Sequence, residues 1–255
     1  MTKRLIFSQF CILLTIVITT LSASGKETIS FVYFNDYPPF GWEENGTMRG
    51  IYIDIVDEVF TNRLNIPVTH RGLPWKRAQL MVFDGTADGF CTAITPKRLK
   101  FTEATQQSII EVNFKIFVPV NGPGLERLRH VSDLSGLKAF KLVDYAGSGW
   151  AQKNLVDRGL NVHWLQRNEQ IWKFLLLGRA DATVNNEWTT RYALKKEGLQ
   201  EQILELPHPM TSEPISFHIF IGKKSPFHPI LEQVDASLGE MKADGTLQRI
   251  HQIYK

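Results

Sequence analysis

The segment MVFDGTAD (residues 81–88) recurs in the second half of the chain as FLLLGRAD (residues 174–181). Each segment closes an amphipathic stretch with a glycine and then enters an apolar run through Ala-Asp. Glycine commonly ends a helix, so we expect a helix-to-strand joint at both places. The recurrence favours two halves of similar construction. The alternative is a chance match, because glycine is common at helix ends.

Outward from these joints, strand-like runs alternate with amphipathic helices, which is typical of an α/β fold with largely parallel sheets. The predicted strands of the first half are residues 28–34, 67–71 and 87–91, and its predicted helices are residues 50–64 and 74–85. The predicted strands of the second half are residues 138–144 and 161–165, and its predicted helices are residues 149–158 and 169–177.

Two apolar runs, residues 114–120 and 215–222, bracket the second half and are expected to carry the chain between two lobes. A helix at 226–241 and a last helix ending near Tyr254 return the chain to the first lobe. The predicted fold class is therefore α/β, with two lobes, each a mixed sheet flanked by helices, joined by two crossing strands. We expect a signal peptide at 1–25, a first lobe of 26–110 plus 213–255, and a second lobe of 111–212. Such an arrangement supports hinge closure around a ligand.

The N-terminal 25 residues predict export. Lys3 and Arg4 precede an apolar stretch, and small residues follow it at a cleavage region, as in a secretory signal peptide. A membrane anchor is the alternative, although polar residues dilute a stretch that is barely long enough to span. We therefore expect a periplasmic protein whose only remaining cysteine is Cys91, held together by its core without an internal disulfide.

Charge excludes one class of partner. The formal net charge of the 255 residues is +3, which becomes +1 once Lys3 and Arg4 are removed, and acids and bases are interspersed. No basic footprint of a nucleic-acid binder is present. The expected partners are a small-molecule solute and a membrane permease or receptor, with no nucleic acid, and we expect a monomer.

Ligands of open α/β sheets bind at the carboxyl ends of the strands. The run after the strand at 87–91 contains Thr92, Thr95 as a helix N-cap, Pro96 in the first turn and Arg98. The planar guanidinium of Arg98 suits a carboxylate because it makes two parallel charge-assisted hydrogen bonds. A solvated surface arginine and an ordinary cap are the alternatives.

Aromatic residues follow the first two strands. Tyr37 lies in Tyr37-Pro-Pro-Phe40, where two prolines fix an extended turn, and Trp75 comes just after the second strand. We expect both rings to contact the ligand, with core packing as the alternative. Ser148, at a strand-to-helix turn of the second lobe, is expected either to donate to the ligand or to serve as a plain helix cap.

Taken in order, these segments resemble the extracellular solute-binding proteins of family 3, the polar amino acid ABC transporter type. The motifs that carry the resemblance are Tyr37-Pro-Pro-Phe40, Gly50-Ile-Tyr-Ile-Asp54-Ile, Gly85-Thr-Ala-Asp88-Gly, Thr95-Pro-Lys-Arg98 with Phe101-Thr102, Asp133-Leu-Ser-Gly136, Gly178-Arg-Ala-Asp181-Ala and Ala243-Asp-Gly-Thr-Leu247. The resemblance implies periplasmic binding of a small polar, carboxylate-bearing solute and its delivery to an ABC transporter.

The resemblance also implies roles for individual residues. Arg98 would pair with the ligand's α-carboxylate, Tyr37 and Trp75 would sandwich its side chain, and the turn around Ser148 would donate from the second lobe. Two positions depart from the family pattern. Ala93 replaces a hydroxyl residue, and Asn186 stands where an acid would hold the α-amino group.

The second departure leaves the ligand class open, because an ammonium in a closed cleft needs a paired charge. Glu187 is an alternative partner for it, or a helix-start residue that faces solvent. A sensor that signals to a receptor and, with less support, a dehydratase-like enzyme are the alternative functions. We predict no enzyme, catalytic residue, cofactor or metal, because no nucleophile–base pair, paired carboxylates or metal-ligand spacing falls in the cleft segments.

Overall fold

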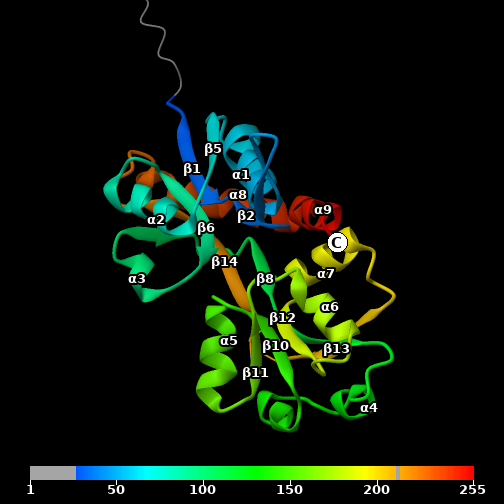
Figure 1. Ribbon diagram of the computed structural model, residues 1–255. Helices are drawn as coiled ribbons and strands as arrows, with labels where there is room; N and C mark the ends of the chain where they lie inside the picture. The colour runs from blue at the N-terminus through cyan, green and yellow to red at the C-terminus, as the bar shows by residue number, and fades with distance from the viewer. Residues whose placement is uncertain (1–26, 211–212) are drawn as a thin grey trace, which may run out of the picture.

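The computed structural model describes residues 27–210 and 213–255 and consists of two lobes, which Figure 1 shows one above the other. The first lobe contains the elements β1 to β8 together with β14 to α9, and the second lobe contains β9 to β13. The blue N-terminal strand and the red C-terminal helices lie in the same lobe. The predicted two-lobed α/β fold is confirmed, whereas the predicted signal peptide lies outside the described residues.

A six-stranded mixed sheet forms the centre of the first lobe. Its strands are β1 (Ile29–Phe34), β5 (Val68–Leu73), β6 (Gly89–Ala93), β7 (Thr102–Ala104), β8 (Ile110–Val112) and β14 (Ile215–Gly222). Strand β1 is parallel to β5 and β6, and β14 runs antiparallel to β6, β7 and β8. Because β14 comes from late in the chain, both ends of the sequence build this one sheet.

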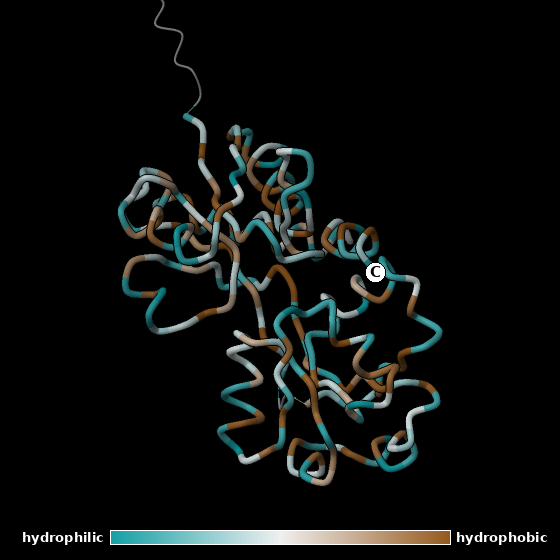
Figure 2. Tube along the Cα trace, in the orientation of Figure 1, coloured by the Kyte–Doolittle hydropathy of each residue, from teal (hydrophilic) through white to brown (hydrophobic). Residues whose placement is uncertain are grey.

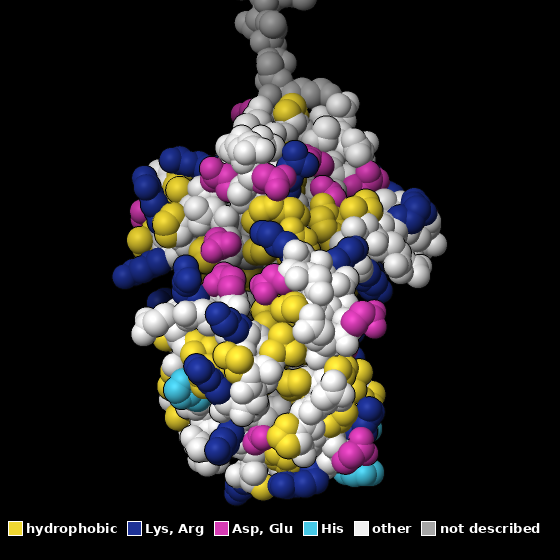
Figure 3. Space-filling view, turned by 45° about the vertical axis from the view of Figure 1, so that its right-hand side comes forward, with side chains coloured by type: hydrophobic (Ala, Val, Ile, Leu, Met, Phe, Trp, Pro, Cys, Tyr) yellow, Lys and Arg dark blue, Asp and Glu magenta, His cyan; other side chains and the backbone are white. Residues whose placement is uncertain are grey.

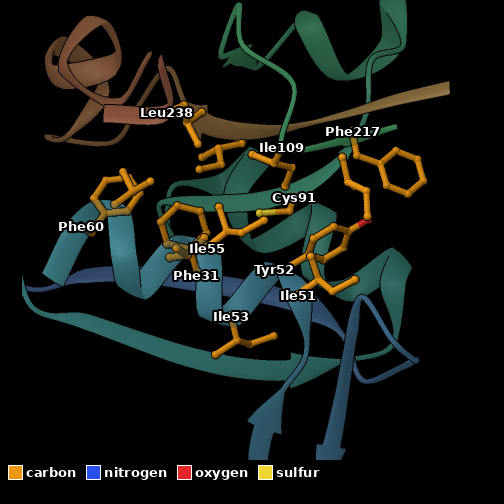
Figure 4. Packing of buried hydrophobic residues seen from close by; sticks show 14 of the residues in the cluster. Phe31, Ile51, Tyr52, Ile53, Ile55, Phe60, Cys91, Ile109, Phe217 and Leu238 are labelled. Carbon is orange, nitrogen blue, oxygen red and sulfur yellow. The ribbon is translucent and has the colours of Figure 1, made fainter. Parts of the chain in front are cut away.

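Helices cover both faces of this sheet. They are α1 (Ile51–Val56), η1 (Asp57–Arg63), α2 (Trp75–Asp84), α3 (Pro96–Leu99), η4 (His228–Ile230), α8 (Leu231–Ala243) and α9 (Thr246–Ile253). Side chains alternate along a strand, so Phe31 packs into the larger core with α1 and α8, while Val32 packs against α2 on the opposite face. Figure 4 shows the larger core, where Phe31, Ile55 and Phe60 gather beneath Leu238.

A three-stranded antiparallel hairpin sheet lies beside α1. Its strands are β2 (Asp36–Tyr37), β3 (Gly41–Glu44) and β4 (Thr47–Arg49). This small sheet carries Tyr37 at one end and Trp42 on β3, and it therefore places aromatic side chains at the junction between the lobes.

The second lobe contains a parallel pair, β10 and β11, and a three-stranded antiparallel sheet in the order β12, β9, β13. One bridge between Leu142 and Ala182 connects the two sheets. The strands are β9 (Phe114–Pro119), β10 (Leu142–Tyr145), β11 (Val162–Leu165), β12 (Thr183–Asn186) and β13 (Ile203–Pro209). The helices are α4 (Leu125–Leu128), η2 (Leu134–Ala139), α5 (Gly149–Asn154), η3 (Val156–Arg158), α6 (Gln170–Leu176) and α7 (Glu187–Glu197).

The chain leaves the first lobe between β8 and β9, with only Asn113 between them, and it returns between β13 and β14. The crossing strands are apolar, and the hydropathy trace shows brown segments concentrated in the strands of both lobes, with teal in many of the outer loops (Figure 2).

Both predicted helix-to-strand joints are present, with Gly85 and Gly178 in the left-handed conformation (φ 81° and 67°).

Three predicted element boundaries are wrong. The strand predicted at 87–91 begins at Gly89, because the Asp88 carboxylate accepts from the backbone and hydroxyl of Ser30 and cross-links the strand start. The strand predicted at 138–144 begins at Leu142, because Asp133 caps a 3₁₀ turn that runs to Ala139. The helix predicted from Pro226 begins only at Leu231, after a separate 3₁₀ turn.

Candidate functional site: an aromatic cavity between the lobes

A cavity of about 250 Å³ lies at the carboxyl ends of β1 and β6, where the first lobe faces the second. Seven of its ten lining residues are aromatic. Its lining residues are Tyr33, Phe34, Tyr37, Gly41, Tyr52, Trp75, Cys91, Thr92 and Phe217 from the first lobe and Tyr145 from the second. A small ligand with an apolar or ring-bearing body fits walls of this kind.

The turn Tyr37-Pro-Pro-Phe40 is fixed by the helix beneath it. The carbonyl groups of Pro39 and Phe40 accept hydrogen bonds of 2.9 Å from the first backbone N–H groups of α1. Gly50 is required at this contact, since its φ is 125° and a Cβ atom would lie 2.6 Å from the Phe40 oxygen. Phe40 is fully buried and packs 4.9 Å from the ring of Tyr37. Tyr37 therefore projects into the cavity from a rigid base.

Arg98 is not itself a lining residue, and three contacts hold it beside Trp75, which is. Its Nε donates to Gln79 (3.2 Å), its Nη1 donates to the Ala93 carbonyl (2.8 Å), and its guanidinium lies 5.3 Å from the ring centre of Trp75. Within the described residues, Nη2 has no hydrogen-bond acceptor. Burial lowers the pKa of Arg98, but an arginine remains charged. The side chain thus keeps donors for an anion beside a partly desolvated cavity.

The predicted cap at Thr95 is confirmed, since its hydroxyl accepts from the Arg98 backbone N–H at 3.4 Å, and Pro96 follows at the first helical position. Thr95 does not line the cavity, whereas Thr92 does. Trp75 lines it too, but one face of its ring already carries the Arg98 guanidinium. The proposed sandwich of Tyr37 and Trp75 therefore has Arg98 as part of one wall.

The second lobe lines this cavity through Tyr145, and Asn186, which is not a lining residue, contacts the cavity residue Tyr37. Asn186 is buried at the end of β12, and its Nδ2 donates to the Tyr37 hydroxyl at 3.2 Å. Its Oδ1 accepts from the backbone N–H groups of Trp188 (2.9 Å) and Thr189 (3.4 Å) and caps helix α7. Asn186 therefore connects the two lobes directly.

Ser148 lies behind the cavity wall and does not line it. Its hydroxyl donates to Asp144 (3.2 Å) and accepts from the Ala151 backbone N–H, so it serves as the cap of α5. Asp144 is buried, and burial raises the pKa of its carboxyl group to about 7 in spite of hydrogen bonds from Tyr145 and Ser148. This serine is thus occupied in the conformation that the structure describes.

Glu187 is also occupied. Its Oε1 accepts from the backbone and side chain of Asn113 (3.1 and 3.0 Å), and its Oε2 lies 3.1 Å from Arg191 and 3.4 Å from Lys115. Glu205 pairs with the same two cations. The carboxylate that the sequence suggested as a partner for the ligand's amino group is instead the buried member of a partly exposed ionic cluster beside the crossing strand β9.

Sequence reasoning missed several lining residues. Tyr52 and Phe217 follow apolar core patterns of a helix and a strand, and they do pack together 6.1 Å apart in the core cluster that Figure 4 shows. Tyr145 stands at the carboxyl end of β10, so the rule that placed ligands at strand ends could have found it. Phe34 ends β1 in the same way.

Outside the cavity, the lobes meet along α7. Trp42 of β3 and Tyr192 of α7 lie with ring centroids 5.5 Å apart, and Lys195 donates to the Lys255 carbonyl at 3.1 Å. The space-filling view of this side shows hydrophobic side chains at the waist, flanked by charged groups of both signs (Figure 3). Across residues 27–210 and 213–255, no cluster of His, Cys, Asp and Glu suits a metal ion, and no helix is long and apolar enough to cross a membrane.

Comparison with known proteins gives one matching family. The model for bacterial extracellular solute-binding proteins, family 3, matches residues 29–255. The probable amino-acid-binding protein YxeM of Bacillus subtilis (strain 168) is 24% identical over 223 residues, which cover 85% of this chain and 79% of that protein.

Solved structures share the fold. The L-cystine solute receptor of Neisseria gonorrhoeae in its unliganded open conformation has a TM-score of 0.71 at 17% identity, covering 90% of this chain and 93% of that one. The second substrate-binding domain of GlnP from Lactococcus lactis, also in an open conformation, has a TM-score of 0.70 at 18% identity, covering 90% of this chain and 96% of that one.

Proposed function

Because the chain belongs to the bacterial extracellular solute-binding proteins, family 3, we propose that it binds a small carboxylate-bearing solute between its lobes and delivers it to the membrane permease of an ABC transporter. The family is one of solute-binding proteins, which agrees with the prediction that the chain is not an enzyme. The amino-acid-binding relative supports a ligand of amino-acid size.

The observation that carries this proposal is the position of Arg98. A guanidinium oriented by Gln79, Ala93 and Trp75 has lost part of its freedom before any ligand arrives, so less entropy is lost on binding. The free Nη2 donors beside an aromatic cavity suit one carboxylate. Tyr37, Thr92 and Trp75 would then contact the ligand body.

In this proposal the first lobe consists of residues 26–110 with 213–255, and the second of residues 111–212. The chain is exported by its signal peptide at 1–25 and works as a periplasmic monomer. Closure of the second lobe brings Tyr145 and Asn186 over the ligand, and the closed form is what the permease recognises.

The test begins with mass spectrometry of whatever co-purifies after gentle extraction, since this assumes no ligand class. The identified compound is then titrated into wild-type protein, R98A and R98K while the melting temperature is followed. We expect no ligand-induced shift for R98A and an intermediate shift for R98K, which keeps the charge without the planar fork. Equal shifts in wild type and R98A would contradict a carboxylate site at Arg98.

A further inference from the structure

The cavity presents hydrogen-bond donors and no carboxylate among the described residues. None of its ten lining residues is Asp or Glu, and the positive charge of Arg98 lies beside Trp75. In the second lobe, the buried acids next to Tyr145 and Asn186 in the sequence are Asp144 and Glu187. Both are engaged with other groups. An ammonium group placed here would be desolvated without a paired charge.

Asn186 offers only donors to the cavity-lining Tyr37. Its amide orientation is fixed, because backbone N–H groups can only donate and two of them, from Trp188 and Thr189, point at one atom of the amide. That atom must be the oxygen. The NH₂ group is therefore the end that faces Tyr37, and turning the amide over would remove the cap of α7.

The hydrogen bond from Asn186 sets the direction of the Tyr37 hydroxyl. A phenol has one proton, and since its oxygen accepts from Asn186, this proton remains free to donate into the cavity. Burial raises the pKa of Tyr37 and also that of Tyr52 well above the usual value, so both phenols stay protonated. The series of hydrogen bonds that starts at Asn186 therefore ends in the Tyr37 hydroxyl as a donor.

We propose that the ligand is a monocarboxylate with an apolar or ring-bearing body whose α-substituent is a hydrogen-bond acceptor, a hydroxyl or carbonyl oxygen, and not an ammonium. This inference rests on the proposed function, which places the carboxylate at Arg98. The α-oxygen would accept from the Tyr37 hydroxyl, and the aromatic walls would enclose the body.

The experiment compares pairs of compounds that differ only at the α-position: L-lactate with L-alanine, L-2-hydroxyisocaproate with L-leucine, and L-3-phenyllactate with L-phenylalanine. Calorimetric titration of the wild-type protein is expected to show, in at least one pair, at least about tenfold tighter binding of the hydroxy acid, a difference of about 1.4 kcal/mol. The melting temperature provides a second readout with the same compounds.

The variant N186D supplies the missing acceptor. Aspartate caps a helix as well as asparagine does, so α7 keeps its N-cap while a second carboxylate oxygen faces Tyr37. We expect N186D to gain affinity for the amino acid of the binding pair and to lose affinity for the hydroxy acid. N186S, which also caps but carries no charge, is expected not to gain amino-acid binding.

The outcomes separate this inference from the proposed function. Tighter binding of an amino acid than of its hydroxy acid by the wild type overturns the inference, while loss of that binding in R98A would leave the carboxylate site standing. Failure of all six compounds to bind overturns the inference as stated, and the co-purified compound then decides the proposed function separately. An unchanged preference in N186D also contradicts the role given to Asn186.

Discussion

The indole Nε1 of Trp188, on helix α7 of the second lobe, donates a 3.2 Å hydrogen bond to the backbone carbonyl of Glu111 on β8 of the first lobe. The Trp188 ring is 7% exposed and belongs to the hydrophobic core of the first lobe. It also meets His251 edge to face at 5.6 Å. A second-lobe side chain is therefore part of the first-lobe core, next to the crossing strand.

The variant W188A is expected to lower the free energy of unfolding by about 3 kcal/mol, since it leaves a cavity where a large ring was buried. W188F keeps most of the packing and loses the hydrogen bond, so we expect a loss of about 1 kcal/mol. Urea titration followed by circular dichroism measures both.

The matched control is W150A. Trp150 stacks on Phe114 at 4.0 Å within the second lobe and makes no contribution to the first-lobe core cluster. Only W188A should separate the unfolding of the two lobes into two transitions. A single transition of unchanged midpoint in W188A would show that this contact does not couple the lobes.

The ionic cluster around Glu187 gives a second prediction. In E187Q, the amide cannot accept from Asn113, Arg191 and Lys115 at once, and it brings donors toward two cations. We expect a loss of about 2 kcal/mol in the free energy of unfolding. Affinity for the ligand should fall far less than in R98A.

E205Q is the control for this variant, because Glu205 binds the same Arg191 and Lys115 but does not contact Asn113 at the lobe junction. If E187Q loses ligand binding while E205Q keeps it, Glu187 contributes to ligand binding, which contradicts the purely structural role given to it here.

The fold could be predicted from the sequence because its signals are local. The helical spacing of residues 51–60 indicates which face of that helix is packed. The glycines at 85 and 178 indicate where two other helices end in the left-handed conformation. Even so, the start of β6 was misplaced, because the hydrogen bonds of Asp88 to Ser30 join residues 58 positions apart. No local pattern encodes such a contact.

The site was predictable only in part for the same reason. Tyr37, Trp75 and Thr92 follow strands that the sequence predicts, so topology could place them at one sheet edge. The hydrogen bond between Tyr37 and Asn186 spans 149 residues, and the use of the Asn186 oxygen as a cap depends on the exact start of α7. These contacts decide the ligand chemistry, and they appear only once the lobes are assembled.

Asp144 predicts a pH dependence of stability. Burial raises the pKa of its carboxyl group from 3.8 to about 7, so between these values the native state holds a proton that the unfolded chain releases. Raising the pH through this window therefore favours unfolding, and the contribution of Asp144 to stability, complete below about pH 4, is lost by about pH 7. D144N, which is neutral throughout, should lack this loss.

The measurement is the difference between wild type and D144N in urea midpoint from pH 4 to 9. We expect the difference to grow in favour of D144N up to about pH 7 and then to level. The buried His218 and the half-buried His251, whose pKa values are lowered by desolvation, act with the opposite sign but cancel in the difference. A flat difference would show that Asp144 is ionised in the native protein.

Cys91 gives a last prediction about the cavity. Its side chain is 5% exposed, although it lines the cavity, and burial raises the pKa of the thiol well above its usual value. The thiolate is the reactive form, so we expect negligible reaction of the native protein with Ellman's reagent at neutral pH.

The protein without residues 1–25 has Cys91 as its only cysteine and should release one equivalent of chromophore once denatured in guanidinium. C91S should release none in either condition. Fast reaction of the native protein would mean that the cavity opens far enough to hydrate its floor, and protection by the bound ligand would then measure how completely the lobes close over it.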